Sequence, residues 1–262
     1  MREVVSLMVA NLAATMRKFA NILPNGCVAE REGLILVDAG ADLPMFNAAV
    51  QVEAAETVDD FERQIAAASD FYGQRAVQWC FWACDGLLGD RPRSTAARVM
   101  ESSGLVPAAT NTGLFANELR PPSRPLPDLR VRAIESGADR QSFCHIMTMA
   151  FDGPAQQISA VYGSNDLWRD GFRGFIGSID GQDVSAGVTV TDRAATGVYA
   201  VGTLPGLIRR GYGEALMRSA ISLAGAFPSQ RPFVLQSTPE ALRLYRRLGF
   251  QRATSFTVYT HD

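Results

Sequence analysis

The sequence predicts an α/β fold in which helices cover a mixed β-sheet. Two apolar, β-branched runs, Phe172–Ile179 and Val184–Thr191, flank the pair Asp180-Gly181, which is typical of a tight β-hairpin. Helical patterns of apolar residues lie before and after these runs. A glycine-rich turn then joins a third run, Thr196–Leu204, to an amphipathic helix that begins near Gly211. Antiparallel strands combined with helices in this way indicate a mixed sheet.

The elements after residue 128 are expected in the order strand, two helices, three antiparallel strands, helix, strand, helix and strand. Their ranges are Leu129–Ile134, Asp139–Phe151, Pro154–Tyr162, Phe172–Ile179, Val184–Thr191, Thr196–Leu204, Gly211–Ala226, Arg231–Ser237, Pro239–Leu248 and Phe256–Thr260. The strands are rich in β-branched and aromatic residues, and the helices repeat apolar residues every three or four positions.

The first half of the chain repeats this order less clearly. Apolar residues recur at helical spacing within residues 1–20. The other expected elements are strands Cys27–Glu32 and Leu34–Asp38, helix Thr57–Arg75, strand Val77–Cys84, helix Ser94–Ser102 and strand Leu114–Leu119. A shift of 145 residues aligns Ala96 with Ala241, Arg98 with Arg243, Gly104 with Gly249 and Ala108 with Ala253. We therefore interpret the chain as two tandem copies of one fold, of which the first is degenerate.

A proline-rich segment separates the two halves. Arg120–Asp128 contains four prolines, which remove backbone donors and prevent a helix or a central strand from continuing. We expect an N-terminal domain over residues 1–120, a linker over 121–128 and a C-terminal domain over 129–262. A long surface loop inside a single domain is the alternative.

The composition excludes several classes of protein. Of the 262 residues 47% are hydrophobic and 20% are charged, which is typical of a globular protein with a substantial core. A formal net charge of −2 gives no general attraction to nucleic acid or to an anionic membrane. No run reaches the roughly 18 apolar residues of a membrane span, and no secretory signal is visible, so we expect a cytoplasmic protein. Four unclustered cysteines and two histidines indicate neither a disulfide framework nor a metal site.

The segment Arg209-Arg210-Gly211-Tyr212-Gly213 lies where a strand ends and a helix begins. The first N–H groups of a helix lack internal partners, and the helix dipole favours an anion beside them. Glycine lets the backbone approach an anion closely, and arginines add charge-assisted hydrogen bonds. The pattern indicates a phosphate or diphosphate site, although such turns are often purely structural. Two other phosphate-binding loops fit poorly. A nucleoside-triphosphate loop needs a lysine that is absent here. A dinucleotide fingerprint follows the first strand of a parallel unit, whereas this turn follows antiparallel strands.

A second segment, Thr238–Phe250, reads Thr-Pro-Glu-Ala-Leu-Arg-Leu-Tyr-Arg-Arg-Leu-Gly-Phe. Thr238 is suited to cap a helix with Pro239 in its first position, and Gly249 is suited to end that helix. Together with the loop Arg209–Gly213, this segment resembles the GNAT superfamily of acyl-CoA N-acyltransferases. The resemblance covers the C-terminal half. It depends on a loop of the form R/Q-x-x-G-x-G/A followed, after a strand, by A-x-x-L-Y-x-x-L-G-F.

The resemblance implies the GNAT acyltransferase fold and assigns roles to particular residues. The coenzyme A diphosphate would lie on Arg209, Arg210, Gly211, Tyr212, Gly213 and Glu214, and the pantetheine arm on Val201, Gly202, Thr203 and Thr238. Tyr245 would protonate the departing thiolate; its alternative role is a packed aromatic beside Leu242 and Leu248. The sequence departs from the family pattern at Ile208, where the family has Arg or Gln, and at Thr238, where many members have Asn. Neither change is disabling, because the loop keeps its glycines and its charge, and the Thr238 hydroxyl group can replace part of the hydrogen bonding of an asparagine.

The expected activity is that of an acetyl-CoA-dependent N-acetyltransferase, which acetylates a small-molecule amine by direct attack in a ternary complex. Strand Thr196–Leu204 contains no acidic residue, so the general base is unassigned; Asp192, Glu240 and a water chain are the candidates. The alternatives are a non-catalytic acyl-CoA-binding regulatory module, and an acyltransferase with another acyl donor or a hydroxyl acceptor. A homodimer is compatible with the sequence, which does not fix the oligomeric state.

The first half is not expected to bind coenzyme A. Met100 aligns with Tyr245, and the helix Thr57–Arg75 begins with Asp59 and Asp60 and has no G-x-G pattern. A phosphate there would meet carboxylates, which is repulsive. The roles left for this half are scaffolding, part of an acceptor pocket, or an oligomer surface. Candidates for acceptor contacts in the second half lie in the segment Phe151–Asp170, where the carboxylates among Asp152, Tyr162, Asp166 and Trp168 could attract a cationic amine. The alternative, which the sequence favours for any single one of these residues, is an ordinary helix and a solvated loop.

Overall fold

The computed structural model describes residues 1–224 and 231–261 and divides into two compact units. Unit 1 comprises Met1–Leu114, Gln236–Leu242 and Arg252–Asp262, and unit 2 comprises Phe115–Leu235 and Arg243–Gln251. The units interleave along the chain, whereas the domains predicted over residues 1–120 and 129–262 are contiguous. The end of the chain causes this difference, because its last strand pairs inside unit 1.

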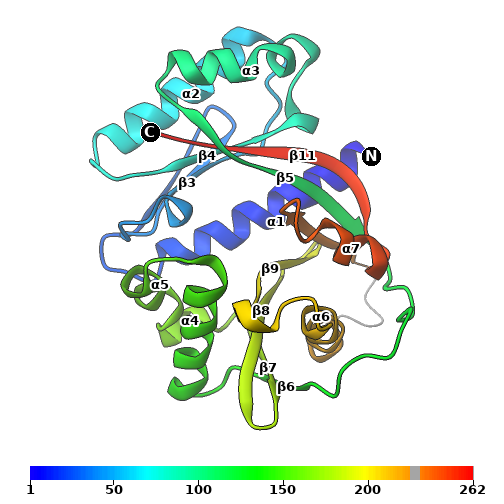
Figure 1. Cartoon of the computed structure of the whole chain (residues 1–262). Coiled ribbons are helices and arrows are strands. Elements are labelled where there is room, and N and C mark those ends of the chain that lie inside the picture. Colours follow the sequence, from blue (N-terminus) through cyan, green and yellow to red (C-terminus); the bar gives the residue numbers. More distant parts are fainter. Residues whose placement is uncertain (225–230, 262) are drawn as a thin grey trace. The chain divides into compact units, whose positions relative to one another are not determined.

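Unit 1 contains six strands and three helices (Figure 1). In chain order its elements are α1 (Arg2–Ala20), β1 (Cys27–Arg31), β2 (Leu34–Asp38), β3 (Ala48–Gln51), α2 (Val58–Gly73), β4 (Cys80–Cys84), α3 (Asp90–Ser102), β5 (Val106–Ala116) and β11 (Gln251–Thr260). The strand order is β1-β2-β3-β4-β11-β5. The first three strands are antiparallel, β4 runs parallel to β3, and β11 runs antiparallel to β4.

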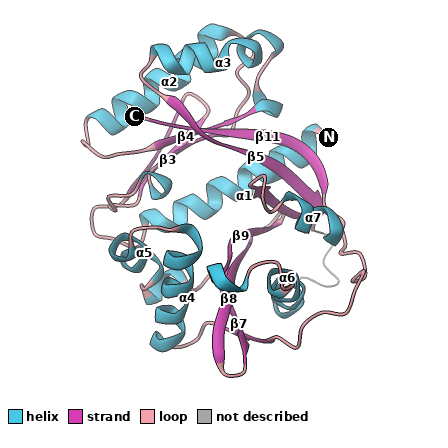
Figure 2. Cartoon of the chain, in the orientation of Figure 1, coloured by secondary structure: helices cyan, strands magenta, loops and turns pink. Residues whose placement is uncertain are grey.

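Unit 2 contains most of the elements that follow the proline-rich segment, whereas the last strand, β11, belongs to unit 1. Its elements are β6 (Arg130–Ala133), α4 (Gly137–Phe151), α5 (Ala155–Tyr162), β7 (Phe172–Ile179), β8 (Gln182–Thr191), β9 (Thr196–Thr203), α6 (Tyr212–Leu223), β10 (Phe233–Ser237) and α7 (Leu242–Leu248). The strand order is β10-β9-β8-β7-β6, with only β10 parallel to its neighbour. Helix α4 packs on β7, β8 and β9, and α6 packs on β6 to β9 (Figure 2).

Apolar periodicity explains how these helices attach to their sheets. The apolar positions of α1, among them Met8 and Leu12, are buried, as the helical spacing predicts. In α2 the side chains of Phe61 and Ile65 enter the core of unit 1. In unit 2, Leu216 of α6 packs in a buried cluster with Ala220 and with Phe175 of β7. A fully buried leucine or phenylalanine contributes roughly 1.5–3 kcal/mol, so these contacts hold the helices in place.

The expected mixed sheet with covering helices is confirmed, and the main differences lie in element limits. Strand β3 was not predicted, and β5 begins at Val106 instead of Leu114. The expectation that Thr238 caps the last helix is wrong, because α7 begins at Leu242. Of the helix expected over Gly211–Ala226, the last two residues lie outside the described part of the chain, as does residue 262. Among the described residues, no helix combines the length and the hydropathy that a bilayer crossing requires.

Candidate cofactor site

The N-terminus of α6 is open. Gly211 is the N-cap residue, with φ +94°, and no side chain of the described residues caps the helix. The first helical hydrogen bond runs from the Ala215 N–H to the Gly211 carbonyl, 3.0 Å away. Within the described part of the chain, the N–H groups of Tyr212, Gly213 and Glu214 have no acceptor. Three backbone donors therefore face away from the helix, together with the positive end of its dipole.

The glycines of this loop are needed for different reasons. The left-handed conformation of Gly211 is unfavourable for any residue with a Cβ, and a Cβ built there would lie 3.1 Å from Pro127 Cδ. At Gly213 the nearest atom to such a Cβ is Leu244 Cδ2, at 3.6 Å, so sterics alone do not require glycine. A glycine at this second position instead leaves the surface above the free N–H groups uncovered.

Two arginines supply positive charge beside these donors. Arg209 and Arg210 are exposed, and neither forms an ion pair with any described residue. One guanidinium nitrogen of Arg210 donates to the Gly206 carbonyl at 3.3 Å. Arg209 has φ +64°, a left-handed conformation that a non-glycine residue seldom adopts. An unpaired cationic loop with strained backbone is typical of an anion site.

Glu214 lies in the first turn of α6 but does not neutralise this charge. Its side chain is 1% exposed and pairs with Arg218 at 2.9 Å and with Arg247 of α7 at 3.5 Å. The carboxylate therefore serves to hold α6 against α7. Only the backbone N–H of Glu214 is left for a ligand.

Strand β9 is distorted just before this loop. Gly202 lies opposite Ala186 of β8, but Tyr199 lies opposite Val188, so β9 has a bulge between these pairs. Ala200 in the bulge has φ +48°. In the described part of the chain, the parallel register with β10 covers only Thr196 and Gly197. The later part of β9 therefore offers backbone groups that β10 does not occupy.

The expected pantetheine contacts Val201, Gly202 and Thr203 lie in this unoccupied part of β9. A Cβ on Gly202 would come within 2.8 Å of Ala150 Cβ, so glycine allows α4 to pack closely on the strand. Val201 packs with the cluster beneath α6. Thr203 Oγ1 lies 3.8 Å from the Cβ position of Gly213. The structure therefore brings the strand residues and the helix N-terminus together.

Tyr245 is buried on α7, with 6% of its surface exposed. Its ring packs edge to face on Phe250, with 5.7 Å between centroids. Burial raises the pKa of its hydroxyl group well above the usual value, so the phenol is protonated at neutral pH. The preceding residue, Leu244, contacts the start of α6 at Gly213. Tyr245 and the open helix end thus belong to neighbouring elements.

The remaining predicted contact, Thr238, belongs to unit 1. It is exposed in a turn, where its carbonyl accepts the N–H of Ala241 at 3.2 Å. A hydrogen bond within Glu240 and one from the Thr238 side chain lower the pKa of the Glu240 carboxyl group. Asp192, the other candidate base, accepts the N–H groups of Ala194 and Ala195 at 2.7 and 2.8 Å, so it organises the turn before β9.

The residues expected to contact the acceptor are mostly structural. Trp168 donates its indole N–H to the Tyr162 carbonyl at 3.0 Å, and both rings pack on Phe143. Asp166 pairs with Arg169 at 3.3 Å. Asp152 is exposed, in a left-handed conformation that ends α4.

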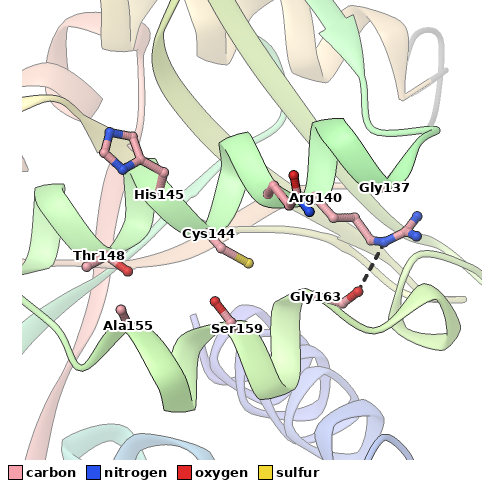
Figure 3. A pocket seen from close by; sticks show the side chains of 9 residues that line it. Gly137, Arg140, Cys144, His145, Thr148, Ala155, Ser159 and Gly163 are labelled. Atoms are coloured by element: carbon pink, nitrogen blue, oxygen red, sulfur yellow. Dashed lines mark hydrogen bonds between the residues drawn. The ribbon is translucent and has the colours of Figure 1, made fainter.

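A pocket of about 500 Å³ lies between α4 and α5 (Figure 3). It is lined by Gly137, Arg140, Gln141, Cys144, His145, Thr148, Ala155, Ser159 and Gly163. Arg140 bounds one end, where its Nε donates to the Gly163 carbonyl at 3.1 Å. Sequence reasoning missed this pocket, and the available signal was the spacing of Ala155, Ser159 and Gly163. These small residues recur every fourth position, which leaves room between two helices.

Comparisons with known proteins agree on the fold. No family model matches the sequence, and no curated protein is detectably similar to it. A GCN5-related N-acetyltransferase from Kribbella flavida superposes with a TM-score of 0.70 over 97% of this chain and 96% of its own, at 14% identity. A conserved protein of unknown function from Staphylococcus epidermidis ATCC 12228 gives a TM-score of 0.62 at 12% identity, over 93% and 97%. A GCN5-related N-acetyltransferase from Sphaerobacter thermophilus gives 0.58 at 14% identity, over 90% and 75%.

Proposed function

We propose, since the chain has the fold of the GCN5-related N-acetyltransferases, that it transfers an acetyl group from acetyl-CoA to the amine of a small molecule. The single observation that carries this proposal is the uncapped N-terminus of α6, with free N–H groups at Tyr212, Gly213 and Glu214 and unpaired arginines beside it. Such a helix end binds a diphosphate without further rearrangement. The unoccupied edge of β9 would bind the amide groups of the pantetheine arm in the manner of an added strand.

Transfer would proceed by direct attack of the amine nitrogen on the thioester carbonyl carbon. The new C–N bond forms, the C–S bond breaks, and the sulfur leaves as a thiolate that takes a proton. Tyr245 is the proposed proton donor, because its buried hydroxyl group is protonated at neutral pH. General acid catalysis of this kind is worth about 10²–10⁴-fold in rate.

The proton on the attacking nitrogen has no assigned acceptor. Asp192 is engaged in its turn, and Glu240 is an exposed residue of a turn in unit 1. An amine that arrives neutral needs only water to take its last proton. We therefore propose water as the acceptor and expect the rate to rise with pH through the pKa of the free amine.

The tandem arrangement is part of the proposal, with only the second copy functional. The 145-residue shift pairs two helix ends that are alike in detail. The Leu105 N–H donates to the Met100 carbonyl and the Phe250 N–H to the Tyr245 carbonyl, each at 3.0 Å. Gly104 and Gly249, the paired residues that follow these helices, both have positive φ. Met100 is thus the counterpart of Tyr245, and it carries no proton to donate.

Calorimetry followed by a turnover assay tests the proposal. We expect acetyl-CoA and CoA to bind with one site per chain, and a panel of small amines to release free thiol from acetyl-CoA. A protein that is folded but has no affinity for CoA at millimolar concentration would refute the proposal. Binding without thiol release across a broad panel of amines would instead favour a non-catalytic acyl-CoA sensor. Faster release with alcohols or with longer acyl donors would correct the substrate class.

A further inference from the structure

The proline-rich segment is fixed to unit 2 at its start. The Arg120 N–H donates to the Leu248 carbonyl at the end of α7, at 2.9 Å, and the Arg120 carbonyl accepts from Arg218 of α6 at 2.6 Å. A Cβ on Gly249 would lie 2.9 Å from Arg120 Cγ, so this contact is also close-packed. Residue 120 therefore joins the segment to two helices that border the candidate cofactor site.

The other end of the segment contacts the α6 loop. Pro127 Cδ lies 3.1 Å from the Cβ position of Gly211, and the Pro127 carbonyl accepts the N–H of Leu129 at 2.8 Å. The segment 120–127 thus spans unit 2 from the end of α7 to the start of α6, and we call it the strap. Its prolines at 121, 122, 125 and 127 limit the conformations available to the free chain, which lowers the entropy cost of holding one path.

The strap places a third cation beside the open helix end. Arg124 Nη2 lies 3.7 Å from the Cβ position of Gly211. Arg124 is exposed, and it forms no hydrogen bond or ion pair with any residue in the described ranges. Arg209 and Arg210 on the loop likewise lack acidic partners, and the carboxylate of Glu214 is occupied by Arg218 and Arg247. Three like charges near one helix end are mutually repulsive unless an anion lies among them.

The negative charge of coenzyme A matches this excess of positive charge. The molecule carries a diphosphate and a separate 3′-phosphate, so it presents more negative charge than the free N–H groups of one helix turn can neutralise. Guanidinium groups bind phosphate oxygens in bidentate geometry and strengthen such contacts. An arginine on a semi-rigid strap loses less conformational entropy on binding than one on a free loop.

We infer that Arg124 binds a phosphate group of coenzyme A, so that the strap is a part of the cofactor site and more than a connector. This inference rests on the proposed function, because it assumes that the α6 loop holds the diphosphate. The group bound by Arg124 is either the 3′-phosphate or the diphosphate of coenzyme A, and the experiment below distinguishes the two.

Calorimetry with Arg124→Gln tests the inference, with CoA and 3′-dephospho-CoA as the two ligands. Arg193→Gln is the matched control, because Arg193 is an exposed arginine that precedes β9, at the opposite end of that strand from the loop. We expect Arg124→Gln to weaken CoA binding about 10-fold, the value for one lost charge-assisted contact, and Arg193→Gln to leave it unchanged. Unaltered thermal unfolding of Arg124→Gln checks that the exposed substitution leaves the fold intact.

The ligand pair assigns the phosphate. A loss seen with CoA alone places Arg124 on the 3′-phosphate, and an equal loss with both ligands places it on the diphosphate. Wild-type affinity of Arg124→Gln for both ligands overturns the inference while leaving the proposed function standing. Failure of the wild-type protein to bind CoA overturns the proposed function, and this inference with it.

Discussion

Helices α2 and α6 occupy equivalent places in their units, yet their N-termini differ in every feature that matters for binding an anion. Each follows an antiparallel set of strands and precedes a strand that runs parallel to the last of them. Helix α2 begins with a capping box, in which Thr57 accepts the N–H of Asp60 at 3.1 Å and Asp60 accepts the N–H of Thr57 at 2.8 Å. Helix α6 has glycine, Gly211, as its N-cap residue, and no side chain of the described residues accepts its first N–H groups.

The difference is the one expected if the start of α2 serves stability and the start of α6, as proposed, binds a ligand. In α2 the capping box supplies acceptors for N–H groups at the start of the helix, and the carboxylates of Asp59 and Asp60 interact favourably with the positive end of the helix dipole. At α6 the same groups are left free, arginines replace the acids, and the loop accepts strained backbone at Arg209. An uncapped helix end and a strained backbone lower the stability of the folded chain, and both are common at binding sites.

The largest expected effect is that of Gly211→Glu. A side chain at φ +94° strains the backbone, collides with Pro127 and places a carboxylate where a phosphate should lie. We expect CoA affinity to fall more than about 100-fold, measured by calorimetry. Gly181→Glu is the matched control, because Gly181 also has positive φ, at +78°, but has nothing within 4 Å of its Cβ position. An equal loss of affinity in both variants would mean that backbone strain, and not the site, causes the effect.

Tyr245→Phe should act on turnover and spare affinity. The substitution removes only the hydroxyl group, and the ring keeps its contact with Phe250. We expect kcat to fall about 100-fold with Kd for CoA changed less than about 2-fold. Steady-state kinetics on the best amine, together with calorimetry, provide both numbers. Full activity of this variant would show that Tyr245 is not the proton donor and that it serves only as a packed core residue.

The paired substitution Arg209→Gln with Arg210→Gln should weaken CoA binding about 10-fold and reduce its dependence on salt. The two guanidinium groups are exposed, so their attraction to phosphate is partly screened. Affinity measured at low and at high ionic strength shows the change in slope. An unchanged slope would assign the anion contacts to backbone N–H groups alone.

Thr57→Ala should have the smallest effect, and only on stability. Loss of the Thr57 hydroxyl group leaves the N–H of Asp60 without its acceptor, at a cost of about 1 kcal/mol in the free energy of unfolding. CoA affinity should be unchanged, because α2 is not the proposed site. Denaturant unfolding with parallel calorimetry checks both expectations. A loss of CoA affinity in this variant would indicate that CoA binds at α2 and would contradict the proposed site at α6.

Local signals made much of unit 2 readable from the sequence. Asp180-Gly181 marked the hairpin of β7 and β8, both residues having positive φ. The glycine-rich turn placed the start of α6 within one residue. Gly249, with φ +104°, marked the end of α7. Each of these depends on a few adjacent residues, which is why spacing and residue type sufficed.

Features that depend on distant partners were not readable. The pairing of β11 with β4 joins residues that are distant in the sequence, from Phe256 with Cys84 to Thr260 with Cys80, and no local pattern predicts it. Strand β3 is only four residues long and buried throughout, so it shows no alternation. The capture of Glu214 by Arg218 and Arg247 needs the packing of α6 on α7. Thr238 matched a capping pattern, but the turn through Ala241 delays the helix.

Hydrogen–deuterium exchange of the full chain, with and without CoA, tests the comparison of the two helix ends most directly. The account predicts that CoA slows amide exchange at Tyr212, Gly213 and Glu214, whose N–H groups are free in the structure. It predicts no change at Asp60, whose N–H group already has Thr57 as its acceptor. Unchanged exchange at residues 212–214 under saturating CoA, or protection at the start of α2 instead, would contradict the account.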